Sequence, residues 1–95
     1  MLDWADMKTR KATVPQHVVH RTLASETVIL NVETGLYYGM DGMGARFFEL
    51  LQQASSVGAA VDALLEEVDE TRERVEHDMD DYCRELLDLG LIELE

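Results

Sequence analysis

Apolar and polar side chains alternate along residues 26–40, whose sequence is ETVILNVETGLYYGM. This period of two predicts a β-hairpin. The first arm has one strongly apolar face, made by Val28, Leu30 and Val32. Glu33-Thr34-Gly35 supplies the turn, with glycine where a three-residue loop needs positive φ. The second arm, Leu36 to Met40, is predicted to be an edge strand, whose unpaired backbone groups are available to another chain.

The pattern around this hairpin predicts the rest of the fold. Residues 17–23 are rich in β-branched and apolar types and predict a preceding strand, which gives a three-stranded antiparallel sheet in chain order. From Gly42 the period becomes helical, and three helices are expected at about 42–54, 57–68 and 71–90, with a brief terminal strand at 91–94. The prediction is an α+β domain of winged helix-turn-helix type, with the sheet followed by three helices.

Residues 1–14 show no clean period, so we expect a flexible or loosely docked N-terminal arm that Trp4 and Met7 could hold in place. The folded domain is expected at residues 15–95.

Ninety-five residues, 46% of them hydrophobic, suit one domain with a modest core and a binding function. No apolar run is long enough for a membrane span, and the single Cys83 fits a reducing compartment, so a cytoplasmic location is expected.

Charge changes the picture because it is unevenly distributed. The chain carries a net charge of −12, and residues 62–95 hold fourteen carboxylates against three arginines. A winged helix usually suggests DNA binding through its third helix. Here that helix would bring carboxylates to the phosphates, so nucleic-acid binding is not expected. The acidic C-terminal third should instead attract basic partners.

The side chains that carry out catalysis do not converge in this sequence. Cys83 and His77 are six residues apart on one predicted helix and point about 120° apart, beyond the reach of a thiolate–imidazole pair. His17 and His20 point to opposite faces of a strand, and the aspartates near residue 80 lack a calcium-binding loop. No phosphate-binding loop is present, and no serine follows an aspartate as a carrier protein requires. We expect no cofactor, no metal and no catalytic activity.

Candidate binding residues lie on the edge strand and on the third helix. Leu36, Tyr38 and Met40 share one strand face, and Met79 and Tyr82 could lie across a groove from it. Tyr38, Met79 and Tyr82 could equally belong to the core. Asp78, Asp81 and Glu85 share one face of the helix. They form either a solvated surface or a groove rim that favours a basic peptide.

Two stretches, VILNVETGLYYGMDGMGARFFELL and the ending ELLDLGLIE, resemble the PqqD-like family of leader-peptide recognition elements, which serve ribosomally made and post-translationally modified peptides. The resemblance runs from about Val18 to Leu94. The stretch LYYGM resembles the discrete recognition proteins of lasso-peptide pathways more than it resembles the proteins of pyrroloquinoline quinone synthesis. The latter usually have a proline-containing motif before the helix, and this sequence lacks it.

The resemblance implies that a precursor's leader adds as an extra strand to the third strand and lies against the third helix. Carried over by position, the peptide-binding residues would be Leu36, Tyr37, Tyr38, Gly39, Met40, Val75, Asp78, Met79, Asp81, Tyr82 and Glu85. The implied partners are a leader-cleaving cysteine protease and an ATP-dependent lasso cyclase. Two alternatives stay open: a PqqD-type chaperone that presents a precursor to a radical SAM enzyme, and a winged-helix regulator.

Overall fold

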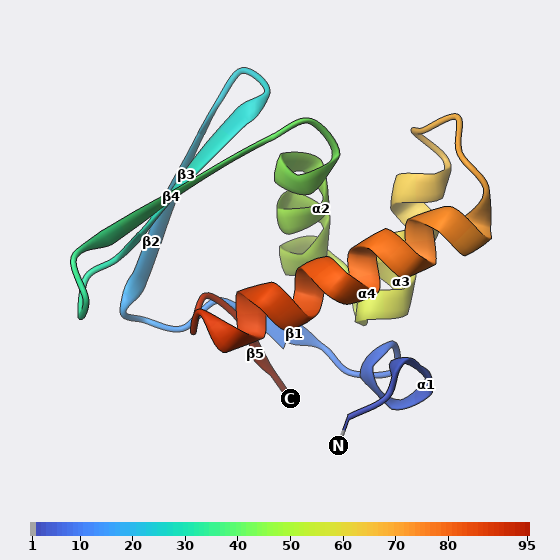
Figure 1. The fold of residues 1–95 in the computed structure, drawn as a ribbon, viewed down its shortest axis with the longest axis horizontal. Helices are drawn as coiled ribbons and strands as arrows, with labels where there is room; N and C mark the ends of the chain where they lie inside the picture. The colour runs from blue at the N-terminus through green and yellow to red at the C-terminus, as the bar shows by residue number, and fades with distance from the viewer. Residues whose placement is uncertain (1) are drawn as a thin grey trace.

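The predicted hairpin and the strand before it form one antiparallel sheet. In the computed structural model, which describes residues 2–95, β2 (Val18–Leu23), β3 (Glu26–Asn31) and β4 (Leu36–Asp41) pair in the order β2-β3-β4 (Figure 1). Gly35 has a φ of +77°, a conformation that favours glycine. Its N–H donates to the carbonyl of Asn31 at 2.8 Å and closes the turn. The sheet order and the edge position of β4 are therefore confirmed.

The face of β3 that packs on the helices is the opposite of the predicted one. Thr27, Ile29 and Asn31 are buried, while Val28 and Val32 are exposed. The two inward polar side chains have partners: the Thr27 hydroxyl lies 2.9 Å from that of Thr22, and Asn31 Oδ1 accepts the N–H of Glu33 at 3.0 Å. A buried polar group that is hydrogen-bonded costs little, so these residues can face the core.

Three helices follow the sheet, as predicted: α2 (Gly42–Gln53), α3 (Val57–Leu65) and α4 (Arg72–Asp88). Ser56 caps α3, because its Oγ accepts the N–H of Ala59 at 3.0 Å. Gly90, with a φ of +71°, ends α4, and the N–H of Leu91 donates back to the Leu86 carbonyl at 2.9 Å. The start of α3 and the end of α4 therefore have local causes in the sequence.

The N-terminal segment differs from the loosely docked arm that we expected. Residues 2–14 form α1 (Trp4–Met7) and β1 (Ala12–Thr13), and β1 pairs with β5 (Glu93–Leu94) at the other end of the chain. Met7 and Ala12 are buried. Lys11 Nζ donates to three carbonyls at the end of α2, those of Leu51, Gln52 and Ala54, at 2.7 to 3.1 Å. The segment thus closes the lower side of the fold in Figure 1.

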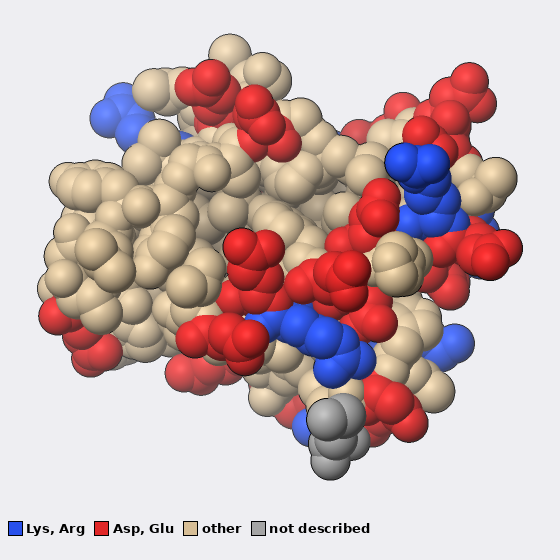
Figure 2. All heavy atoms as spheres, in the orientation of Figure 1, with Lys and Arg blue, Asp and Glu red and all other residues tan. Residues whose placement is uncertain are grey.

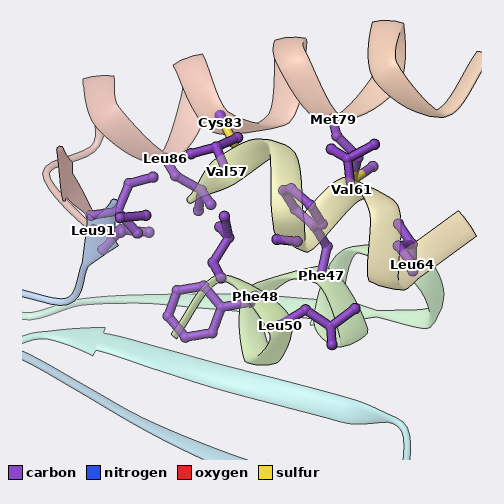
Figure 3. Packing of buried hydrophobic residues seen from close by; sticks show 14 of the residues in the cluster. Phe47, Phe48, Leu50, Val57, Val61, Leu64, Met79, Cys83, Leu86 and Leu91 are labelled. Carbon is purple, nitrogen blue, oxygen red and sulfur yellow. The ribbon is translucent and has the colours of Figure 1, made fainter. Parts of the chain in front are cut away.

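The core lies between α2, α3 and α4. Figure 3 shows Phe47 and Phe48 of α2 facing Val57 and Val61 of α3, with Met79, Cys83 and Leu86 of α4 above them. Figure 1 shows α2 standing between the sheet and the other two helices, so that α2 holds the inner face of the sheet against the core. Within residues 2–95, no helix combines the length and the apolar composition that crossing a membrane requires.

Candidate functional site

β4 forms one of the two outer edges of the three-stranded sheet. The N–H of Val32 donates to the carbonyl of His17 in the segment before β2, and backbone groups point alternately to the two sides of a strand. Asn31, Ile29 and Thr27 therefore point toward β4, where they pair with Leu36, Tyr38 and Met40. It follows that Tyr37, Gly39 and Asp41 direct their N–H and C=O groups away from the sheet. In the described chain no strand pairs with these outward groups.

Side chains leave this edge accessible. Leu36 is 55% exposed and Tyr37 is 70% exposed. A Cβ placed on Gly39 would meet no atom within 4 Å, so the space beside this residue is open to an approaching backbone. The predicted edge residues thus lie together on an open edge, with Tyr38 and Met40 half-buried on the side that faces the helices.

Tyr82 of α4 connects this edge to the helices. Its hydroxyl lies 2.6 Å from Met40 Sδ and donates to the carbonyl of Gly44 at 3.1 Å. Its ring lies 6.2 Å from that of Phe47, at an angle of 57°. Burial raises the pKa of Tyr82, so the hydroxyl stays protonated and available as a donor. Tyr82 and Met40 therefore lie side by side between β4 and α4, as the sequence suggested.

Acidic side chains line α4 on this side of the molecule. Asp81 and Glu85 are exposed and Asp78 is half-buried. Asp81 lies 3.6 Å from His77 in an exposed pair. The neighbouring Arg84 is directed elsewhere, since it bonds to Asp80 at 2.8 Å and to the carbonyl of Leu2 at 2.7 Å. Figure 2 shows the result, an uncharged recess between the sheet and α4 with carboxylates along its border.

Two of the predicted groove residues belong to the core. Val75 is 0% exposed and Met79 is 4% exposed, because both lie on the side of α4 that packs on α2 and α3. The helical stripe is centred on Val75, Met79, Cys83 and Leu86, so Tyr82 lies at its margin and the carboxylates lie outside it. Val75 and Met79 therefore support the fold and offer almost no surface to a ligand.

Sequence reasoning missed two features of this region. Glu26 and Asp41 are directly opposite each other at the end of the β3–β4 ladder, beside a hollow of about 240 Å³ that also adjoins Gly39. Only the strand register brings these two carboxylates together. The second feature is the carbonyl of Gly44, which receives the Tyr82 hydroxyl. The sequence carried no signal for it, because the contact depends on how α4 packs against the first turn of α2.

The outer face of the sheet is apolar and open. It carries Val19 and Leu23 from β2, Val28 and Leu30 from β3 and Tyr37 from β4, around a hollow of about 290 Å³. These side chains lie opposite the face that carries Tyr38 and Met40. A strand added to β4 would therefore have one set of side chains beside Tyr37 and the other set facing α4.

The residues that could perform chemistry are dispersed. Burial raises the pKa of the Cys83 thiol to about 12, so the thiol is not ionised at neutral pH. His17 Nε2 lies 3.2 Å from the Gly90 carbonyl, and His20 packs edge-on against Phe48 at 5.2 Å. Among residues 2–95, no three His, Cys, Asp or Glu side chains are grouped closely enough to hold a metal ion. The arrangement offers a surface for binding a peptide backbone.

Comparisons with solved structures find the same fold in two chains. The first, described as "TbiB1 in Complex with the TbiA(beta) Leader Peptide", is 34% identical, has a TM-score of 0.79, and the alignment covers 84% of this chain and 93% of that one. The second, described as "Lasso peptide synthetase B1 complexed with the leader peptide", is 17% identical with a TM-score of 0.78, over 87% and 98% of the two chains. At that identity the second likeness shows the fold alone.

No curated protein sequence matches the chain. A family model does match: the one described as "Coenzyme PQQ synthesis protein D (PqqD)" aligns with residues 26–92. The matched range begins at β3 and ends just before β5, so it includes the β4 edge, α4 and the acidic residues along it. It covers well over half of the chain, and with it the chain belongs to the PqqD family.

Proposed function

We propose that this chain is a non-catalytic adaptor that binds the leader of a ribosomally synthesised precursor peptide by strand addition to β4. The observation that carries the proposal is the free edge of β4, where Tyr37 and Gly39 point their backbone groups outward beside α4. Strand addition supplies main-chain hydrogen bonds for affinity and leaves alternate side chains to give specificity. The TbiB1 structure, 34% identical over most of its length, is described as a complex with a leader peptide, which supports this choice of ligand.

Backbone pairing alone does not provide enough free energy. Four or five hydrogen bonds contribute ~0.5–1.5 kcal/mol each, whereas association costs ~4–15 kcal/mol. At least two apolar anchor side chains, contributing ~1.5–3 kcal/mol each, are therefore required. The anchors on the inner side would meet Tyr38, Met40 and Tyr82, which are half-buried and already near one another.

The acidic border of α4 favours a leader with Lys or Arg on this side. By helical spacing Asp78, Asp81 and Glu85 lie on the solvent side of Tyr82 on α4, whereas Glu26 of β3 and Asp41 of β4 oppose each other at the end of the ladder and carry their side chains on the outer face of the sheet. Like charges that face each other across strands are unfavourable, so a cation from a ligand would relieve the repulsion. The same charges oppose a nucleic-acid partner.

Binding the leader would allow the adaptor to deliver the precursor to separate enzymes. The product we propose is a lasso peptide, and the partners are a leader-cleaving cysteine protease and an ATP-dependent cyclase. The resemblance of the LYYGM stretch to the discrete recognition proteins of lasso-peptide pathways supports this branch. The family model, described by coenzyme PQQ synthesis, supports a second candidate, in which the same edge presents a precursor to a radical SAM enzyme. Purified enzymes of the two kinds, each assayed for precursor processing with and without this chain, distinguish the candidates.

The binding claim is tested by calorimetric titration with the precursor peptide encoded beside this chain. Three ligands are compared: the full precursor, its leader half and its core half. We expect the full precursor and the leader half to bind with similar dissociation constants, in the nanomolar to micromolar range, and the core half not to bind. A leader half that fails to bind, or a core half that binds equally well, would refute the proposal.

A further inference from the structure

Tyr82 is placed where three elements meet. Its side chain starts on α4, its hydroxyl reaches Met40 of β4, and its ring lies against the first turn of α2 at Gly44. The side chain is only half-buried, so part of it remains accessible to solvent. Tyr82 therefore combines partial exposure to solvent with contacts to both β4 and α2.

The two contacts of the hydroxyl differ in strength. A tyrosine hydroxyl has one proton, and a carbonyl oxygen is a better acceptor than a thioether sulfur. The bond to the Gly44 carbonyl therefore fixes the ring, while the contact with Met40 Sδ is soft and can yield. Gly44 has no side chain between its backbone and the ring, so the ring lies directly on α2. Tyr82 is thus the rigid neighbour of this site and Met40 is the adaptable one.

A strand paired with Tyr37 and Gly39 would turn every second side chain to the face of Tyr38 and Met40. The side chain that arrives next to Met40 meets the Tyr82 ring, because the hydroxyl of that ring is already within 2.6 Å of Met40 Sδ. The space available to this ligand side chain ends at the Tyr82 ring, which its hydrogen bond to the Gly44 carbonyl holds in place.

We propose that Tyr82 is the specificity-determining residue of the peptide site, setting the largest apolar side chain that a bound strand can place beside Met40. This inference rests on the proposed function, since it concerns the same edge. The Tyr82 ring limits the size of the ligand side chain beside Met40. A side chain that fits gains contact area with the ring, and a larger one must displace Met40. Hydrophobic sites usually discriminate one methylene by about 10- to 200-fold, so the limit should be measurable as a change in preference.

The experiment uses the leader half of the precursor encoded beside this chain as its probe. An alanine scan of that peptide first identifies the apolar position whose affinity responds to Met40→Ala, which marks the side chain beside Met40. Peptides with Ala, Val, Leu or Phe at that position are then titrated into the parent protein, Tyr82→Phe and Tyr82→Ala. Circular dichroism and thermal unfolding check that each variant is folded, and Tyr82→Leu replaces Tyr82→Ala if the latter is not.

Tyr82→Phe keeps the ring, so the order of preference among the four peptides should match that of the parent. Tyr82→Ala should favour larger side chains and raise the ratio of Phe to Val affinity by about tenfold or more. Val19→Ala, on the outer face of β2, is the control and should leave both the order and the ratio unchanged. The inference is wrong if folded Tyr82→Ala shows the same ratio of Phe to Val affinity as the parent protein. Failure of the parent protein to bind any leader peptide would instead refute the proposed function.

Discussion

At the scale of single residues, the direction of each backbone N–H decides what β4 can bind. Tyr37 and Tyr38 are adjacent, yet the Tyr38 N–H faces Ile29 within the sheet and the Tyr37 N–H faces outward. The side chains alternate in the same way, with Tyr37 on the outer face and Tyr38 toward the helices. A substitution that tests peptide binding must therefore be made at Tyr37, because proline at Tyr38 would break the pairing with β3.

We predict that Tyr37→Pro weakens leader binding by at least about tenfold, through loss of one outward N–H and obstruction by the proline ring. Edge strands accept proline where the N–H faces outward, so the sheet should remain folded. Tyr37→Ala keeps the N–H and removes the ring, and it serves as the control. Calorimetry measures both affinities and circular dichroism checks the fold. Equal affinities for the two variants would argue against main-chain pairing at this residue.

The buried thiol of Cys83 gives a prediction about pH. Burial raises its pKa from the ordinary 9.0 to about 12, so between these values the folded chain retains a proton that the unfolded chain has lost. The stabilisation is therefore complete below pH 9 and declines as the pH rises from 9 to 12. Each unit in that range should remove about 1.4 kcal/mol of unfolding free energy for this group.

Urea unfolding at pH 8, 9, 10 and 11 tests this prediction when the parent protein is compared with Cys83→Ala. The variant lacks the thiol and should lose stability less steeply above pH 9, although its cavity lowers stability at every pH. Burial raises the pKa of Tyr82 in both proteins, and the Cys83 thiolate raises it further in the parent, so the difference in slope reports Cys83 together with its effect on Tyr82. Parallel curves would show that the thiol does not titrate as proposed.

At the scale of elements, β3 shows what a strand pattern can predict. Alternation placed the strand and its turn correctly, because both depend on residues close together in sequence. It chose the wrong face because it assigned the more apolar set, Val28, Leu30 and Val32, to the core, whereas the face with Ile29 between two polar residues packs on the helices. Thr27 and Asn31 can point inward only because Thr22 and the turn provide their hydrogen-bond partners, and those pairings are known only once the register is known.

The element that gives the edge its chemical character is α4. Sequence placed its carboxylates on one side correctly, but it could not separate Val75 and Met79, which enter the core, from Tyr82, which lies at the margin. The separation depends on how α4 is rotated against α2 and α3. A helix with 3.6 residues per turn leaves that rotation to the packing of its neighbours.

We predict that Asp78→Lys combined with Asp81→Lys weakens binding of a basic leader by about tenfold at low salt and reduces its salt dependence. The control is Glu66→Lys combined with Glu73→Lys, which makes the same change in net charge at exposed positions. Calorimetry in low and high salt measures both. An affinity that changes equally in the two double variants would mean that only total charge matters.

At the scale of the whole molecule, the sequence predicted the sheet, the helices and their order. It did not predict how the N-terminal segment packs against α2 and the C-terminal strand. The N-terminal segment had no period of its own, and its contacts reach distant residues: β1 pairs with β5, and Lys11 caps α2 from about forty residues away. Such contacts leave no local pattern. The edge of β4 was predictable because a hairpin, a turn glycine and a helix start all lie within one short stretch.

Within residues 2–95 both outer strands of the sheet, β2 and β4, have an unpaired edge, and we propose that the peptide binds only to β4. On β2 the alternation of backbone groups turns His20 and Thr22 outward, just as it turns Tyr37 and Gly39 outward on β4. Only β4 lies beside the carboxylates of α4 and the half-buried pair of Met40 and Tyr82. Comparison of the two edges within one molecule therefore provides an internal control.

The central claim is tested most directly by amide hydrogen exchange, measured by NMR with and without the leader half of the precursor. We predict that the outward amides of Tyr37 and Gly39 exchange more slowly when the leader is bound, while those of His20 and Thr22 exchange at unchanged rates. Slower exchange on β2, or bound leader with no change at Tyr37 and Gly39, would contradict strand addition to β4.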